Sequence, residues 1–326
     1  MKAVLCKQFG PPESLVLEAV ASPTPGPGEV RLRVHAAGVN FPDTLIIEGK
    51  YQYKPEFPFS PGGEVAGEVL EVGAEVTDVA PGDRVMAGMT YGAFAEEVVA
   101  GAERVMRIPD ELDFLTAASM SLTYGTAAHA LIERGRLQAG ETLLVHGAAG
   151  GVGLSMVEVG KAMGARVIAT AGTEEKLRAA KSHGADEVIN YVENEFRDAV
   201  KDLTDGKGAD VICDPVGGDV FDQSLRCINW GGRLLVIGFA SGRIASAPAN
   251  LVLLKGCSLV GVFWGSYIER DPEGNAANFE RIFQWWREGA IKPHISHTFP
   301  LAQASDALYA LLERKVIGKA VLKIVD

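Results

Sequence analysis

The stretch that decides the fold is residues 142–163, with the sequence TLLVHGAAGGVGLSMVEVGKAM. Thr142–His146 is a short apolar run that predicts a strand, and the pattern after the glycines predicts a helix to about Met163. A glycine-rich turn in this position indicates a dinucleotide-binding site, although packing of strand on helix alone would also favour glycine. Gly147 and Gly150 permit a tight turn that a pyrophosphate can approach, and Gly153 permits close packing of helix and strand.

Around this stretch, length and composition indicate a globular protein of two domains. The chain has 326 residues, of which 47% are hydrophobic and 22% charged, values that exclude intrinsic disorder. Its 38 glycines follow no collagen-like period, so the surplus is expected in tight turns or where the backbone approaches a ligand. The net charge of −11, with no block of Lys or Arg, argues against a nucleic-acid partner.

The cysteines and the longest uncharged runs bear on compartment. Four cysteines lie far apart, at positions 6, 213, 227 and 257, which excludes a zinc site built from neighbouring cysteines and disfavours a disulfide scaffold. Leu115–Ile132 and Thr142–Val157 are too rich in Ser, Thr or Gly to predict a membrane span. Without an apolar run behind Lys2 and Lys7 we expect no signal peptide, no membrane association and a cytoplasmic location.

The pattern along the chain changes near Leu115–Thr126. The first third predicts short strands of a barrel-like β unit, at Val30–Ala36, Glu64–Val72 and Arg84–Met89. The middle alternates strands and helices, which predicts a parallel sheet. Its expected strands are Thr142–His146, Arg166–Ala171, Glu187–Asn190, Asp210–Cys213, Arg233–Gly238 and Ser258–Val262, with helices at Glu174–His183, Glu195–Leu203 and Val220–Ile228. The tail predicts two amphipathic helices, Asn275–Glu288 and Ala302–Glu313, and a strand, Ala320–Val325.

The end of the second strand of this sheet indicates which dinucleotide is bound. An NAD site has an acidic residue there for the ribose 2′-hydroxyl, but residues 170–173 read Thr-Ala-Gly-Thr. Lys176 and Tyr191 supply a cation and a phenol that suit a 2′-phosphate, which predicts NADPH rather than NADH, unless Lys176 is only a solvated helix lysine. Glu174 and Glu175 argue the other way but also suit a helix N-terminus.

The whole chain resembles the medium-chain dehydrogenase/reductase superfamily, and within it the zinc-free quinone oxidoreductase branch (NADPH:quinone oxidoreductase-like). Besides the glycine turn, the residues that carry the resemblance are 37–44 (AGVNFPDT), 61–67 (PGGEVAG), 81–85 (PGDRV), 122–127 (LTYGTA) and 317–319 (IGK). The resemblance implies an α/β fold with two domains. A GroES-like β-rich catalytic domain would span residues 1–120 and be completed by 266–326, and a Rossmann domain with a doubly wound parallel sheet would span 121–265.

Two positions set this branch apart from its zinc-dependent relatives. Zinc alcohol dehydrogenases carry a catalytic Cys where this chain has Asn40, and a His where it has Gly63. Catalytic zinc needs three protein ligands and an open position. We therefore expect no metal in this protein.

The resemblance also implies roles for individual residues. Asn40, Tyr51 and Thr126 would be catalytic and face the nicotinamide end of the cleft, although Asn40 could merely satisfy buried backbone groups and Tyr51 merely line the cleft wall. The cofactor-binding residues would be Gly147, Gly150, Gly151, Val152 and Gly153 at the pyrophosphate; Gly172, Thr173, Lys176 and Tyr191 at the adenosine phosphate; and Phe239, Phe263, Trp264, Gly265 and Lys319 on the nicotinamide side. The family further implies a homodimer built by joining Rossmann sheets.

The expected function is transfer of hydride from NADPH to a quinone or an α,β-unsaturated carbonyl, without zinc. The alternative enzyme is an acrylyl or 2-enoyl thioester reductase on the same scaffold. An alternative of another class is a non-catalytic NADPH-binding structural or RNA-binding protein, which the acidic charge disfavours. The partner would thus be a small electrophile: a quinone, an enone or an enoyl thioester.

Overall fold

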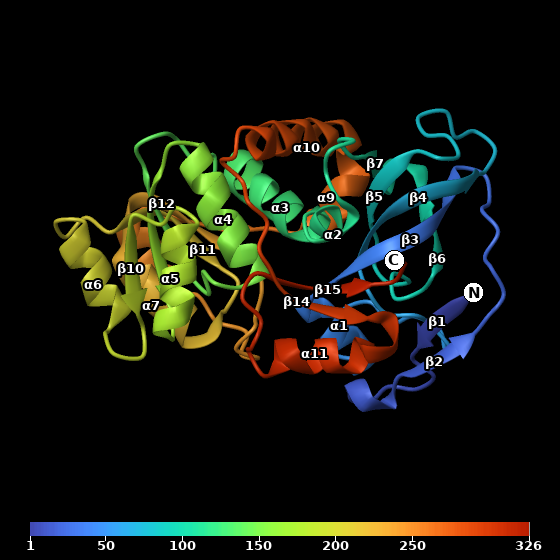
Figure 1. The fold of residues 1–326 in the computed structure, drawn as a ribbon. Coiled ribbons are helices and arrows are strands. Elements are labelled where there is room, and N and C mark those ends of the chain that lie inside the picture. The colour runs from blue at the N-terminus through green and yellow to red at the C-terminus, as the bar shows by residue number, and fades with distance from the viewer. Residues whose placement is uncertain (326) are drawn as a thin grey trace. The chain divides into compact units, whose positions relative to one another are not determined.

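The computed structural model describes residues 1–325, which form two compact units (Figure 1). The first comprises Met1–Leu122, Gly265–Ala276 and the chain from Pro293 onward; the second comprises Thr123–Trp264 and Ala277–Lys292. The family resemblance implies that all of residues 266–326 complete the first domain. Residues 277–292 join the second because Asn278 donates to the Glu133 carboxylate at 2.9 Å and Phe279 packs edge-on against Trp264.

The first unit is built on a seven-stranded sheet whose strand order is β14-β15-β3-β4-β5-β7, with β6 also paired to β3. Its centre is β3, in which Val30, Leu32 and Val34 are buried while Arg33 points to solvent, the alternation of a half-buried strand. The strands are β1 (Lys2–Leu5), β2 (Val16–Ala19), β3 (Glu29–Val39), β4 (Glu64–Val72), β5 (Arg84–Gly88), β6 (Glu97–Gly101), β7 (Val105–Arg107), β14 (Ile295–Pro300) and β15 (Lys319–Lys323). The helices are α1 (Phe41–Ile47), α2 (Phe114–Ala118), α9 (Trp264–Arg270) and α11 (Ala304–Leu312).

The second unit is built on a six-stranded sheet whose order is β10-β9-β8-β11-β12-β13, with every neighbouring pair parallel. Numbered by position within the unit this order is 3-2-1-4-5-6, that of a Rossmann fold. The strands are β8 (Thr142–Val145), β9 (Arg166–Ala171), β10 (Glu187–Asn190), β11 (Ala209–Asp214), β12 (Ile228–Val236) and β13 (Ser258–Gly261). The α-helices that lie wholly or mostly in this unit are α3 (Ser121–Ala128), which a π-helical segment (His129–Arg134) prolongs, α4 (Gly151–Ala162), α5 (Glu174–Ser182), α6 (Phe196–Leu203), α7 (Gly218–Cys227), α8 (Ala249–Lys255) and α10 (Pro272–Arg287).

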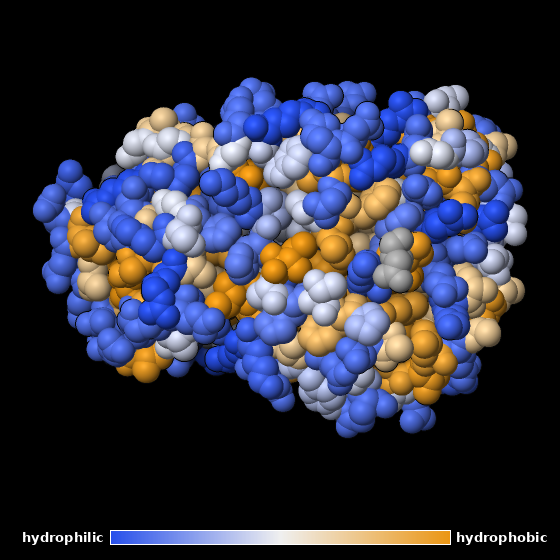
Figure 2. Space-filling model, viewed as in Figure 1, coloured by the Kyte–Doolittle hydropathy of each residue, from blue (hydrophilic) through white to orange (hydrophobic). Residues whose placement is uncertain are grey.

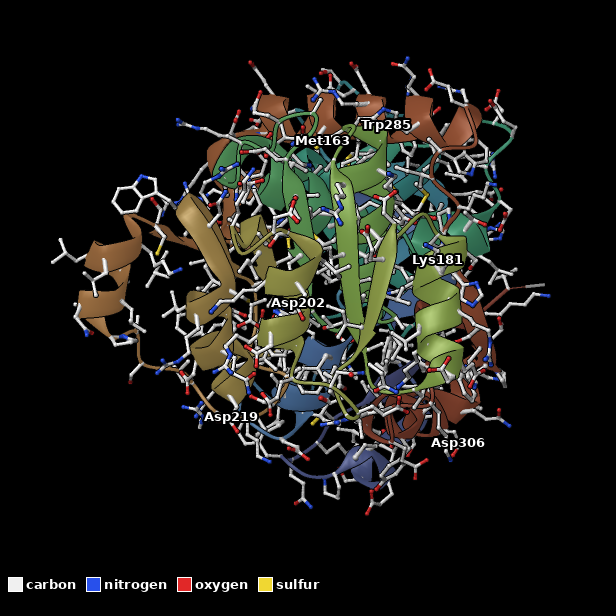
Figure 3. All side chains as sticks on the ribbon, turned by 90° about the vertical axis from the view of Figure 1, so that its left-hand side faces the viewer. Met163, Lys181, Asp202, Asp219, Trp285 and Asp306 are labelled. Carbon is white, nitrogen blue, oxygen red and sulfur yellow. The ribbon has the colours of Figure 1, made fainter. Side chains whose placement is uncertain are left out.

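Helices cover both faces of this parallel sheet. Figure 3 shows α5, which carries Lys181, on one side of the strands and α6, which carries Asp202, on the other. The central strand is correspondingly apolar; Leu143, Leu144 and Val145 of β8 are all fully buried.

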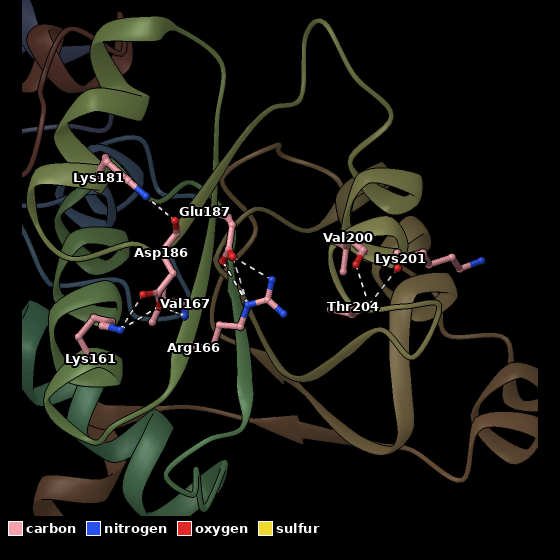
Figure 4. A network of polar contacts seen from close by, with 9 residues as sticks. All are labelled: Lys161, Arg166, Val167, Lys181, Asp186, Glu187, Val200, Lys201 and Thr204. Carbon is pink, nitrogen blue, oxygen red and sulfur yellow. Dashed lines mark hydrogen bonds and ion pairs between the residues drawn. The ribbon is translucent and has the colours of Figure 1, made fainter.

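Ion pairs fix the amino ends of β9 and β10 (Figure 4). The Asp186 carboxylate accepts hydrogen bonds from Lys161 of α4 at 2.9 Å and from the Val167 N–H at 2.7 Å. Beside it, Arg166 and Glu187 pair across the two strands at 2.8 Å. These contacts lie at the end of the sheet opposite the glycine turn, so they support the strands without occupying the ligand-binding edge.

The surface of the longest tail helix is polar. Figure 2 shows mostly hydrophilic side chains over α10, whose inward residues Asn278, Phe279 and Ile282 are buried. Among the helices of residues 1–325, none combines the length and the apolar character that crossing a bilayer requires.

Candidate active site

The glycine turn lies at the carboxyl end of β8 and requires glycine at two positions. Gly147 has a φ of +58°, in the left-handed region that favours glycine. A Cβ added to Gly153 would lie 2.2 Å from the Gly147 carbonyl oxygen, which no other residue could tolerate without moving the turn. Gly150 precedes the first helical residue, Gly151, so the free N–H groups of the α4 N-terminus face outward from the turn.

The turn occupies the topological switch point of the sheet. From β8 the strand order continues to β9 on one side and to β11 on the other, and ligands of such sheets bind where the order reverses. The Asp214 carboxylate at the end of β11 accepts the N–H groups of Val216 and Gly217, each at 2.8 Å, and thereby shapes the adjoining loop. Burial raises the pKa of Asp214.

The histidine directly before the turn is neutral. Ser224 donates its hydroxyl proton to the Val220 carbonyl at 2.7 Å, so it accepts the His146 Nε2 proton at 2.9 Å, and Nδ1 is left to accept from Thr170 at 3.0 Å. Burial lowers the pKa of His146 to about 3. His146 therefore adds no positive charge beneath the turn, which leaves the helix N-terminus as the local attraction for an anion.

The predicted adenosine-phosphate residues come together at the end of β9. A Cβ on Gly172 would lie 2.9 Å from the Tyr191 hydroxyl, so the phenol lies over that glycine, as expected for neighbouring parallel strands. Thr173 is the N-cap of α5 and accepts the Lys176 N–H at 3.3 Å, which places Lys176 in the first turn of the helix. A glycine, a threonine, a lysine and a tyrosine thus share one corner.

The predicted nicotinamide-side aromatic residues differ in exposure. Trp264 is buried, and its ring covers Gly125, where an added Cβ would lie 2.4 Å from Cε2. Phe239 lies against Gly217, and Phe263 is 57% exposed. Gly265 falls in α9 and belongs to the first unit. Packing explains Trp264 without a ligand, and the cofactor contacts of these residues stay predictions.

Thr126 is the predicted catalytic residue of the second unit. It is buried on α3 beside Gly125. The helix is anchored two residues earlier, where the Tyr124 hydroxyl donates to the buried Glu158 carboxylate at 2.5 Å. The other Glu158 oxygen accepts the Lys292 N–H at 3.0 Å, so one carboxylate holds α3 to α4 and to the chain after α10.

In the first unit, Asn40 and Lys319 join a buried polar cluster with Glu64. Lys319 Nζ donates to Glu64 Oε1 at 2.5 Å, to Asn40 Oδ1 at 2.6 Å and to the Val39 carbonyl at 3.2 Å. Asn40 Nδ2 donates to the same Glu64 oxygen at 2.8 Å. The three protons of the ammonium thus have three protein acceptors. The family resemblance implies a cofactor contact for Lys319, and that contact stays a prediction.

A second carboxylate, Asp43, lies beside this cluster. The Asn40 N–H donates to Asp43 Oδ2 at 2.7 Å, and the Asp43 N–H bonds back to the Asn40 carbonyl at 3.0 Å, which starts helix α1. A Cβ on Gly63 would lie 3.8 Å from Asp43 Oδ1. Tyr51 follows α1, and its pKa is raised by burial and then by the negative charge of Asp43.

Sequence reasoning assigned no role to Glu64 or Asp43. Two signals were present: an acidic residue opening the apolar strand Glu64–Val72, and the spacing Asn-x-x-Asp at a helix start, which is typical of a capping box. Neither signal identifies Lys319 as the partner, because that residue lies 255 positions from Glu64.

The positions where zinc relatives carry ligands have other occupants here. The Asn40 amide is held by Lys319 and Glu64, and Gly63 has no side chain. Within residues 1–325 no group of three or more His, Cys, Asp or Glu side chains is arranged to hold a metal ion.

Comparison with known proteins identifies the family. Residues 26–110 match the family model of the alcohol dehydrogenase GroES-like domain, and residues 151–280 match that of the zinc-binding dehydrogenases. Quinone oxidoreductase-like protein 2 of Rattus norvegicus is 41% identical over 324 residues, covering 99% of this chain and 92% of the relative. Escherichia coli quinone oxidoreductase, solved in complex with NADPH, superposes with a TM-score of 0.93 at 30% identity, covering 99% of this chain and all of the other. A 2-haloacrylate reductase superposes with a TM-score of 0.89 at 32% identity, and the match covers all of both chains.

A GroES-like unit joined to a Rossmann unit defines the medium-chain dehydrogenase/reductase class. Within that class, the chain belongs to the quinone oxidoreductase family.

Proposed function

We propose that the protein is an NADPH-dependent oxidoreductase that reduces a quinone or an α,β-unsaturated carbonyl without zinc. The observation that carries the proposal is the corner at the end of β9, where the Tyr191 hydroxyl lies over Gly172 and no acidic residue takes the place of the ribose ligand of NAD enzymes. The names of the relatives support the same class, because they include quinone oxidoreductases, one in complex with NADPH, and a 2-haloacrylate reductase.

The residues of the second unit fit the dinucleotide. Gly150 and Gly151 leave the N-terminus of α4 without side chains where a pyrophosphate would approach, and Lys176 and Tyr191 would hold the 2′-phosphate. When bound, NADPH supplies the hydride.

The first unit would supply hydrogen bonds to the substrate. Reduction of a conjugated carbonyl builds negative charge on its oxygen, and without a metal that charge needs hydrogen-bond donors. We assign this role chiefly to the Tyr51 hydroxyl, with Thr126 as the candidate in the second unit. The Asn40 amide is already engaged by Lys319 and Glu64, so we infer that it orders that buried cluster.

The test is steady-state oxidation of NADPH and NADH by the pure protein over a panel of quinones, enones and acrylyl thioesters. The proposal requires turnover of a quinone or enone. Turnover confined to thioesters would establish the alternative reductase. The similarity to a 2-haloacrylate reductase supports that alternative, because a 2-haloacrylate and an acrylyl thioester are both activated alkenes. No turnover at all, together with an NADPH-dependent RNA gel shift, would establish the non-catalytic alternative.

We predict that Lys176→Ala weakens the preference for NADPH. Removing one charge-assisted bond to a phosphate costs about 1.5–3 kcal/mol, which is roughly a 10- to 100-fold rise in the NADPH dissociation constant. NADH binding should change less than about twofold. The measurement is titration calorimetry with both nucleotides, and Lys181→Ala on the same helix is the control. An equal loss for both nucleotides would contradict the assignment.

We further propose a homodimer that forms along β13. This strand is the edge of the parallel sheet and leaves unpaired backbone groups on one side. Leu259 on the strand is exposed, and so are Leu253 and Leu254 of the neighbouring helix α8, at the left of Figure 3.

The unpaired, buried cysteines fit the expected cytoplasmic location.

Acidic substitutions at this edge should give monomers. In a symmetric dimer, Leu254→Glu combined with Leu259→Glu would bring the new charges of the two subunits close together. The molar mass measured by light scattering after size exclusion should therefore fall from that of a dimer to that of a monomer. Val192→Glu, at another exposed apolar position of the second unit, is the matched control. A monomeric wild-type protein, or a dimer that survives both changes, would refute the proposal.

A further inference from the structure

The buried cluster of the first unit contains more acid than base. Glu64, Asp43 and Lys319 are all less than 5% exposed, so two carboxyl groups share one ammonium. Burying an unpaired charge is costly, and an isolated buried carboxylate takes up a proton instead. One of these two carboxyl groups is therefore expected to be protonated.

The contacts decide which one. Glu64 has the direct ion pair, with Lys319 Nζ at 2.5 Å, and its second oxygen accepts the Leu122 N–H at 2.7 Å. The remaining Lys319 protons go to the Asn40 side chain and to the Val39 carbonyl, not to Asp43. Asp43 receives the Asn40 N–H, a single neutral donor. The negative charge of the cluster is thus held at Glu64, and the proton at Asp43.

We propose that Asp43 is a positioning residue that carries a proton at mildly acidic pH, loses it as the pH rises above neutral and, while protonated, keeps the Tyr51 hydroxyl an effective donor to the substrate oxygen. This inference rests on the proposed function, because it concerns the donor assigned to the substrate. It does not require Asp43 to touch the substrate or to give up its proton during turnover.

The burial of Asp43 and the charges around it agree with placing the proton on this carboxyl. Burial raises the pKa of Asp43 to about 7; the Asn40 N–H and the Lys319 charge oppose this rise, and the Glu64 charge adds to it. The charged groups that act on Asp43 are Glu64 of β4 and Lys319 of β15, and the charge of Asp43 acts in turn on Tyr51, in the loop after α1. Above neutral pH the ionised Asp43 raises the pKa of Tyr51, which makes the phenol a weaker donor, and it repels negative charge that builds on a substrate.

The charge that Asp43 gains when it ionises sets the direction in which kcat/KM changes with pH. In the wild-type protein kcat/KM should fall as pH rises through about 7. Asp43→Asn keeps the size and the acceptor for the Asn40 N–H but cannot ionise. Its kcat/KM should stay within about threefold of the wild-type value at pH 6 and show no decline near pH 7. Asp110→Asn, at an exposed carboxyl of the same unit, should keep the wild-type profile.

A second readout is independent of activity. Infrared difference spectra of the ligand-free protein between pH 6 and 8 should contain the carbonyl band of a protonated carboxyl that is lost through about pH 7. Labelling aspartate with carbon-13 should shift that band, which assigns it to an aspartate even if Asp43→Asn fails to fold. The band should be absent in Asp43→Asn and present in Asp110→Asn.

Each outcome decides between the hypotheses. No protonated-aspartate band at pH 6 overturns the proposal whether or not the protein is active. A wild-type alkaline decline in Asp43→Asn, or loss of its activity at every pH with the fold retained, overturns it as well. A titrating band that Asp43→Asn lacks, with no turnover of any electrophile, leaves the protonated Asp43 in place but overturns the proposed function and, with it, the catalytic consequence.

Discussion

Replacing Lys319 by Met should destabilise the protein by about 3–5 kcal/mol, because it leaves the Glu64 carboxylate buried without its cation. Glu64 is completely buried, and Lys319 Nζ is 2.5 Å from it. The change also removes the donor that holds the Asn40 side chain. The measurement is urea denaturation followed by circular dichroism. The free energies of unfolding are compared using the same dependence on urea concentration for both proteins.

Two further variants show whether the unpaired charge is the cause. Lys323→Met lies on the same strand at an exposed position and should change the free energy of unfolding by less than about 0.5 kcal/mol. Adding Glu64→Gln to Lys319→Met removes the charge that was left alone and should recover more than half of the loss. If the double variant is no more stable than Lys319→Met, the loss comes from packing and the electrostatic explanation is wrong.

The second large effect is expected at the glycine turn, where Gly153→Ala should weaken NADPH binding by about 100-fold or more. A Cβ there would lie 2.2 Å from the Gly147 oxygen and 2.7 Å from Ala148 Cα. Both are backbone atoms, so the backbone of the turn itself must move to accommodate the methyl group. Loss of about 2.8 kcal/mol of binding free energy corresponds to that factor. Titration of the intrinsic fluorescence or calorimetry measures it directly.

The control for an added methyl group is Gly261→Ala. Gly261 lies in the same unit on β13, and an added Cβ there meets nothing within 4 Å. It should bind NADPH as the wild-type protein does. Tight NADPH binding by Gly153→Ala would mean that the turn does not hold the pyrophosphate, which would remove the basis of the cofactor assignment.

The sequence predicts the second unit well because its signals are local. Apolar strands alternate with amphipathic helices at short spacing, and the observed strands at Arg166–Ala171 and Glu187–Asn190 have the predicted bounds. The contact of Tyr191 with Gly172 was also predictable, since neighbouring parallel strands end at the same edge. The tail was less exact: the predicted strand Ala320–Val325 is Lys319–Lys323, which brings Lys319 into the sheet.

The cluster in the first unit could not be predicted because its members come from distant parts of the chain. Asn40, Glu64 and Lys319 meet only once β15 pairs with β3 and β3 with β4. The motifs point to Asn40 and Lys319, but only packing shows that each is the other's hydrogen-bond partner. Trp264 is a similar case, since its burial against Gly125 depends on tertiary contacts rather than on its own neighbours.

The same long separation has a consequence during synthesis. The second unit is complete when Lys292 has left the ribosome, and its sheet is continuous from Thr142 to Gly261. The first unit lacks β14 and β15 until residues 295–323 emerge, so Ala36–Val39 of β3 wait without a partner strand on one edge and Glu64 waits without its counter-ion. Because domains fold as their residues become available, the nucleotide-binding unit should fold first, and the unit that begins the chain should be the last to form.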